Sequence, residues 1–67
     1  MQQIKFKELP IPAYFTFKEV HYVKLTATKV RSFGKNTEEV IRSNPLVTYW
    51  GQDMMAFVNA VNKENFN

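Results

Sequence analysis

The sequence contains no cysteine, only two glycines and three prolines, and a single histidine among its 67 residues. The lack of cysteine excludes disulfides, thiolate metal sites and cysteine nucleophiles, and it fits a reducing environment. No apolar run approaches the roughly 18 residues of a membrane span, and residues 1–7 lack the apolar run of a signal peptide. We therefore expect a soluble, cytoplasmic protein.

The chain is also short. We expect residues 1–67 to form one domain, and a domain of this size buries only about 60% of the surface that its unfolded chain exposes. Such a chain can complete its core by forming a homodimer or by docking on its target. It offers no room for a scaffold and a separate substrate domain.

Catalytic side chains are correspondingly scarce. His21 is the only histidine, so a nucleophilic site requires Ser32 or Ser43 beside it and an acidic residue behind it, and no motif indicates that arrangement. Gly34-Lys35 lacks the flanking residues of a phosphate-binding loop. We expect no enzymatic activity, no cofactor and no metal site.

The charge is unevenly distributed along the chain. Residues 1–35 contain seven Lys/Arg and two Asp/Glu, which gives 7 − 2 = +5, whereas residues 36–67 contain two and four, which gives 2 − 4 = −2. The basic half permits attraction to nucleic acid or to an acidic protein surface, but an overall charge of +3 does not require either.

Residues 14–33 combine aromatic, β-branched and basic side chains without Gly or Pro, a composition typical of a β-meander. Pro10 and Pro12 fix the backbone and remove two amide donors, so we expect an extended lead-in and the first paired strand only after Pro12. The predicted strands cover residues 13–18, 20–26, 28–33 and 46–50. A turn near Lys18-Glu19 is expected although the usual Gly or Asn is missing.

Two segments allow a short helix. Thr37 can cap a helix over residues 37–42, and Asp53 can cap one over 53–62, where apolar residues share a helical face. A short strand from Met54 to Val58 is an equal alternative for the second segment. The predicted fold is mainly β: a small, curled antiparallel sheet or partly open barrel, with a helix as an option at either place.

Turn geometry then predicts the strand registers. A two-residue turn at Lys18-Glu19 pairs Phe15 with Tyr22, and a tight turn at Thr26-Ala27 pairs Tyr22 with Arg31. The second turn also sets Lys24 opposite Lys29. The three cations then lie on the same face as the aromatic rings. That face is either a core whose lysine stems reach water at its rim or an exposed platform that binds bases or an acidic partner.

The segments Phe6–Pro10, Tyr14–Lys24 and Ala27–Arg31, followed by Thr48-Tyr49-Trp50-Gly51, resemble short bacteriophage-encoded proteins of unknown function. The resemblance covers residues 6–33 and 48–51. It implies a small β-barrel or curled sheet and a phage origin, and it favours a strand in the carboxyl-terminal segment. It implies no activity.

These observations lead to a functional prediction. We expect a non-enzymatic phage accessory protein that binds a host or phage protein with an acidic surface in the host cytoplasm, through Lys24, Lys29, Arg31 and Trp50. One alternative is sequence-tolerant binding of single-stranded nucleic acid by the same aromatic and basic residues. A second is a minor structural component of the virion.

Overall fold

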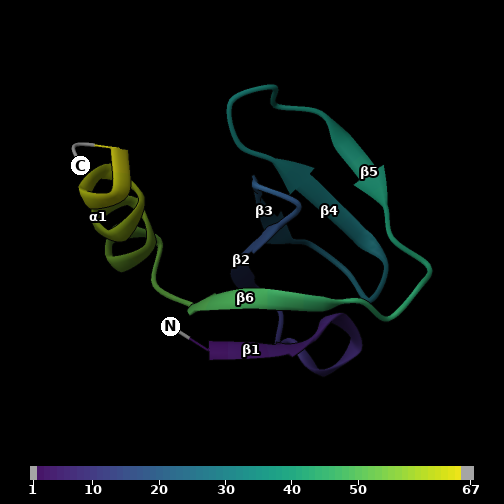
Figure 1. The fold of residues 1–67 in the computed structure, drawn as a ribbon. Helices are drawn as coiled ribbons and strands as arrows, with labels where there is room; N and C mark the ends of the chain where they lie inside the picture. The colour runs from purple at the N-terminus through teal and green to yellow at the C-terminus, as the bar shows by residue number, and fades with distance from the viewer. Residues whose placement is uncertain (1, 66–67) are drawn as a thin grey trace.

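The computed structural model describes residues 2–65, which form one open, six-stranded antiparallel sheet and a carboxyl-terminal helix (Figure 1). The order across the sheet is β1-β6-β2-β3-β4-β5, so β2 to β5 form a meander and β6 returns to lie between β1 and β2. The prediction of a small, mainly β fold with an unclosed sheet is confirmed. The elements are β1 (Gln2–Lys5), the 3-10 turn η1 (Phe6–Glu8), β2 (Ala13–Phe17), β3 (Val20–Lys24), β4 (Lys29–Ser32), β5 (Glu38–Val40), β6 (Leu46–Gly51) and α1 (Met54–Asn65).

The two optional helices have different outcomes. Residues 53–62 fall on α1, where the Asp53 side chain accepts a hydrogen bond from the backbone N–H of Met55 at 3.0 Å and thus caps the helix. The alternative strand from Met54 to Val58 is wrong. A helix over residues 37–42 is also wrong, because Glu38–Val40 forms β5 and pairs with β4.

The amino-terminal segment is more ordered than a simple lead-in. Gln2–Lys5 forms β1, which pairs with β6, so the prediction that the first paired strand follows Pro12 is wrong. After β1 the chain turns through η1, where the backbone N–H of Phe6 donates to the carbonyl of Pro45 at 2.8 Å. The prolines lie outside every strand, consistent with their missing amide donors.

The β2–β3 hairpin has the predicted register, with Phe15 opposite Tyr22 and Phe17 opposite Val20. Its two turn residues, Lys18 and Glu19, have φ values of 51° and 67°. Two successive residues with positive φ form the kind of primed turn that matches the twist of a hairpin. The hairpin therefore closes with residues that ordinarily avoid this conformation.

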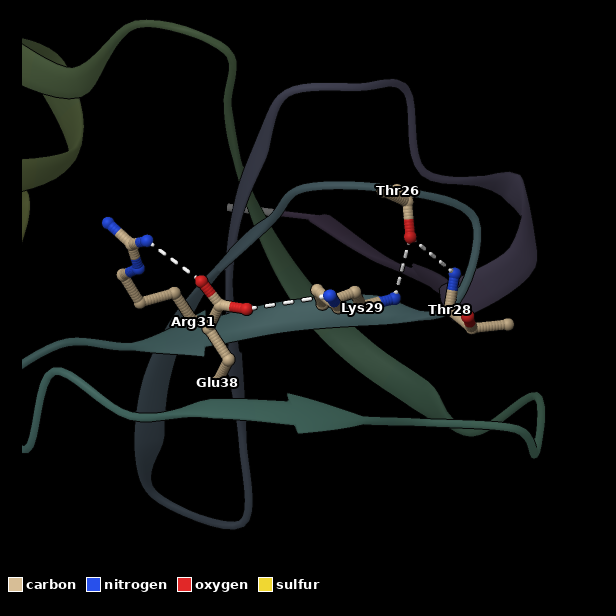
Figure 2. A network of polar contacts seen from close by, with 5 residues as sticks. All are labelled: Thr26, Thr28, Lys29, Arg31 and Glu38. Carbon is tan, nitrogen blue, oxygen red and sulfur yellow. Dashed lines mark hydrogen bonds and ion pairs between the residues drawn. The ribbon is translucent and has the colours of Figure 1, made fainter.

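The β3–β4 register differs from the prediction by one residue. Tyr22 lies opposite Ser32, and Val23 lies opposite Arg31. The connection is a four-residue loop, not a two-residue turn, because the Thr26 hydroxyl accepts hydrogen bonds from the backbone N–H groups of Thr28 (3.4 Å) and Lys29 (3.0 Å) (Figure 2). A shift of one residue moves every β4 side chain to the other face of the sheet.

The two faces of the sheet are covered differently. The core face, named for the side that carries Phe15, is closed by the amino-terminal segment, whose Phe6 and Leu9 are buried. The opposite side, the helix face, is covered in part by α1 through Phe57. The buried cluster on the core face consists of Phe6, Leu9, Ala13, Phe15, Tyr22, Val30 and Val47.

Candidate functional site

Lys24, predicted to bind a partner, lies on the core face and is only 2% exposed. Its ammonium donates hydrogen bonds to the carbonyls of Phe6 and Leu9, each at 3.0 Å, and lies 4.6 Å from the centroid of the Phe6 ring. Burial lowers the pKa of Lys24 below its usual value. Lys24 of β3 therefore links the amino-terminal segment to the sheet through these two hydrogen bonds.

Lys29 and Arg31 lie on the opposite face, at alternate positions of β4, and they flank Glu38 of β5 (Figure 2). The Arg31 guanidinium donates to the Glu38 carboxylate at 2.9 Å, and the Lys29 ammonium lies 3.6 Å from the same carboxylate. The hydrogen bond from Arg31, followed by the charge of Lys29, lowers the pKa of Glu38. The predicted single patch of Lys24, Lys29 and Arg31 is therefore wrong, because the observed register places Lys24 on the other face.

Trp50 lies on the helix face of β6 and is half-buried. Its indole N–H donates to the Thr16 hydroxyl at 2.7 Å, and its ring centroid lies 6.5 Å from that of Phe57. It is separated from Lys29 and Arg31 across the sheet, since β2 and β3 lie between β6 and β4. The structure thus brings together only two of the four predicted partner-binding residues.

The aromatic face is a core and not an open platform. Phe15 and Tyr22 are buried and stack at 5.3 Å between ring centroids. Across residues 2–65, every aromatic ring is buried or half-buried. The expected contact between Arg31 and Tyr22 does not form, because the two residues lie on opposite faces.

His21 is part of the packing beneath α1. Its Nδ1 forms a hydrogen bond with the Thr16 hydroxyl at 2.6 Å, and its ring meets the edge of Phe57 at 5.7 Å. The Thr16 hydroxyl also accepts a hydrogen bond from the Trp50 indole N–H at 2.7 Å, so it lies between the imidazole and the indole. The arrangement orients side chains under the helix.

One part of the helix face is left uncovered by α1. Figure 1 shows the helix beside the β6 end of the sheet, away from β4 and β5. We call the uncovered part the open face and define it by Val23, Lys29, Arg31, Glu38 and Val40, which lie side by side in the registers of β3, β4 and β5. Val40 is 52% exposed and the two cations are about half exposed. The open face therefore combines apolar surface with positive charge.

A groove runs between the open face and the start of α1. Its volume is about 350 Å³, and we call it the α1–β4 groove. A smaller hollow of about 170 Å³ shares Phe33 with this groove and is otherwise lined by His21 and by residues of α1. Sequence reasoning missed the groove because its lining residues lie far apart in the sequence, from β2 to the first residue of α1. The residues that line the α1–β4 groove are Tyr14, Val23, Arg31, Ser32, Phe33, Gly34, Asn36 and Met54.

Other kinds of site find little support in the described chain. No group of three His, Asp or Glu side chains within residues 2–63 is placed to hold a metal ion. None of the helical segments in this range is long and apolar enough to cross a membrane. Comparison of the chain with protein-family models, curated proteins and solved structures gives no match.

Proposed function

We propose that this chain is a non-enzymatic protein-binding module that docks its open face on an acidic surface of a partner protein. The observation that carries the proposal is the pairing of two half-exposed cations, Lys29 and Arg31, with one carboxylate, Glu38, beside the exposed Val40. The cluster keeps a net positive charge. Arginine beside apolar surface is typical of the residues that anchor interfaces.

The energetic roles of these residues differ. Exposed ion pairs contribute only about 0–1 kcal/mol each, so Lys29 and Arg31 mainly orient the partner and raise the association rate. Burial of apolar surface at Val23 and Val40 supplies most of the affinity, at roughly 25 cal/mol per Å² removed from water. An acidic partner surface that carries apolar side chains satisfies both requirements.

The resemblance to short bacteriophage proteins suggests the source of such a partner. It favours a host or phage protein met in the host cytoplasm. A second copy of this chain fits the open face less well, because two open faces docked on each other would bring together surfaces that each carry a net positive charge.

The experiment compares two charge reversals of equal size. Lys29→Glu with Arg31→Glu changes the open face, whereas Lys5→Glu with Lys7→Glu changes exposed residues at the amino terminus by the same amount. Tagged wild-type and variant proteins are used to capture partners from host lysate, at low and at physiological salt, after circular dichroism confirms that each is folded. We expect one set of partners that the terminal variant retains and the open-face variant loses. Equal capture by both variants would overturn the proposal.

Nucleic-acid binding is an outcome that this experiment must separate from protein binding. Sequence-tolerant binding of single strands relies on bases that stack on exposed aromatic rings. Within residues 2–65 the aromatic rings are buried or half-buried. Fluorescence anisotropy with mixed oligonucleotides at about 50 mM salt, where the phosphate contribution is strong, gives the direct readout. Tight binding there that the open-face variant abolishes would replace a protein partner with nucleic acid.

A further inference from the structure

We infer that the α1–β4 groove receives a large apolar side chain of the partner protein, next to a partner carboxylate that binds Arg31. This inference rests on the proposed function and specifies the chemistry of the partner segment. It goes beyond attraction between an acidic and a basic surface, because it requires an apolar residue and an acidic residue to be neighbours in the partner.

The walls of the groove are largely apolar. Its lining includes the side chains of Tyr14, Val23, Phe33 and Met54, and Met54 is 52% exposed. The volume of about 350 Å³ lies at the lower end of the range for ligand pockets, roughly 300–1,000 Å³. A space of this size suits one large side chain with its adjoining backbone.

Arg31 supplies the positive charge of the groove. It is the one charged residue among those that line the groove, and within residues 2–65 its guanidinium makes a single recorded hydrogen bond, from Nη2 to Glu38. A guanidinium has five N–H donors, so a second carboxylate can bind beside Glu38. Glu38 has one negative charge against the two positive charges of Arg31 and Lys29, so the cluster keeps one net positive charge that can attract a partner carboxylate.

The groove and the open face are continuous. Val23 and Arg31 belong to both, so a partner that docks on the open face passes the mouth of the groove. The contact that anchors an interface is usually a large side chain in a well-formed pocket, ringed by weaker contacts. The α1–β4 groove is the pocket of this kind that borders the exposed cations.

The first experiment uses small probes that separate the two chemical requirements. N-acetyl-phenylalanine carries a ring next to a carboxylate, N-acetyl-phenylalanine amide carries the ring alone, and acetate carries the carboxylate alone. In a titration followed by amide NMR, we expect N-acetyl-phenylalanine to shift the signals of Val23, Phe33, Asn36 and Met54 more strongly than either of the other two. Shifts that map to another surface, or equal shifts with acetate, would overturn the inference.

The second experiment fills the groove without changing any charge. Met54→Trp places a large ring at the groove, whereas Met55→Trp places it on the neighbouring helix position, which is 66% exposed and outside the groove. We expect Met54→Trp to weaken binding of N-acetyl-phenylalanine and of the captured partner by roughly tenfold or more, the scale for a side chain that no longer fits its pocket. Met55→Trp should bind as wild type does.

The two proposals fail in different ways. If the partner is lost with Lys29→Glu and Arg31→Glu but retained with Met54→Trp, the open face binds the partner and the groove inference is wrong. If the partner is retained by both variants, the proposed function itself is wrong. Arg31→Gln, which removes the positive charge without introducing a negative one, should abolish the preference for the carboxylate probe over its amide.

Discussion

The ring of Phe57 stacks on the ring of Tyr14, with 5.2 Å between centroids and an interplanar angle of 24°. Phe33 meets the same Phe57 ring edge-on at 5.1 Å. Among residues 54–63, Phe57 is the only side chain of α1 that is fully buried. The position of the helix, and with it one wall of the α1–β4 groove, therefore depends on this ring.

Removing the Phe57 ring should release the helix from the sheet. We expect Phe57→Ala to lower the free energy of unfolding by about 3 kcal/mol, because the substitution deletes a buried aromatic side chain and leaves a cavity. The helical signal in circular dichroism should fall and the fluorescence of Trp50 should shift to the red as its ring becomes hydrated. Met55→Ala, at an exposed position of the same helix, is the control and should stay within about 0.5 kcal/mol of wild type. A Phe57→Ala protein with the wild-type helical signal and stability would show that the helix is held by other contacts.

The β2–β3 turn stores strain that a substitution can remove. Lys18 and Glu19 both have positive φ, a conformation that costs a residue with a side chain on the order of 1 kcal/mol. Asn-Gly is the preferred pair for such a turn. We expect the double change Lys18→Asn and Glu19→Gly to raise the free energy of unfolding by about 1 kcal/mol, measured by urea denaturation. No gain, or a loss, would mean that the Lys18 ammonium, 5.3 Å from the Phe17 ring centroid, offsets the strain.

The sequence predicts the hairpin of β2 and β3 correctly because composition and turn length are local properties of the chain. Both strands are rich in aromatic and β-branched residues, and a two-residue turn at Lys18-Glu19 sets Phe15 opposite Tyr22. The prediction survives the unusual turn residues because burial of the two rings outweighs the strain at Lys18 and Glu19.

The β3–β4 register could not be predicted in the same way. Its loop length is set by the Thr26 hydroxyl, which captures two backbone N–H groups, and sequence composition does not distinguish this loop from a tight turn. The predicted register, which differs from the observed one by one residue, places Arg31 on the core face together with Lys24. In the structure Arg31 lies on the helix face. The open face and its carboxylate, Glu38, do not follow from the sequence, because the pattern allows only a short helix over residues 37–42 where the structure has β5.

The carboxyl-terminal segment shows a different limit. The residues from Met54 onward fit a helix and a strand equally well by their pattern. The structure resolves the choice through contacts of Phe57 with Tyr14, His21 and Phe33, which lie far away in the sequence. A signal for the helix was present in the capping Asp53, but capping alone does not tell which sheet face the helix will cover.

Lys24 provides the last prediction, which concerns pH. Burial lowers its pKa in the folded protein, whereas the unfolded chain keeps the ordinary value of 10.5. Between the lowered pKa and 10.5 the unfolded chain holds a proton that the folded protein has released, so the free energy of unfolding rises with pH across this window. Below this window Lys24 is protonated in both states, and the free-energy cost of burying its ammonium lowers stability in full. Above pH 10.5 Lys24 is neutral in both states, so its contribution to the free energy of unfolding no longer changes with pH.

The substitution Lys24→Met isolates this effect. It keeps an apolar stem but leaves the carbonyls of Phe6 and Leu9 without their donor, so we expect a loss of about 1–3 kcal/mol at neutral pH. The difference between wild type and Lys24→Met should then grow as the pH rises toward 10.5, since only the wild type gains stability from the released proton.

Urea denaturation of both proteins from neutral pH to about pH 11 gives the measurement. Tyr22, whose pKa is raised first by burial and then by the charge of Glu39, is present in both proteins, so its contribution cancels in the difference. Lys7→Met, at an exposed position of η1, serves as the matched control for the loss of one lysine side chain. A wild-type advantage over Lys24→Met that stays constant or shrinks with rising pH would contradict a lowered pKa at Lys24, and with it the burial of its ammonium beneath the amino-terminal segment.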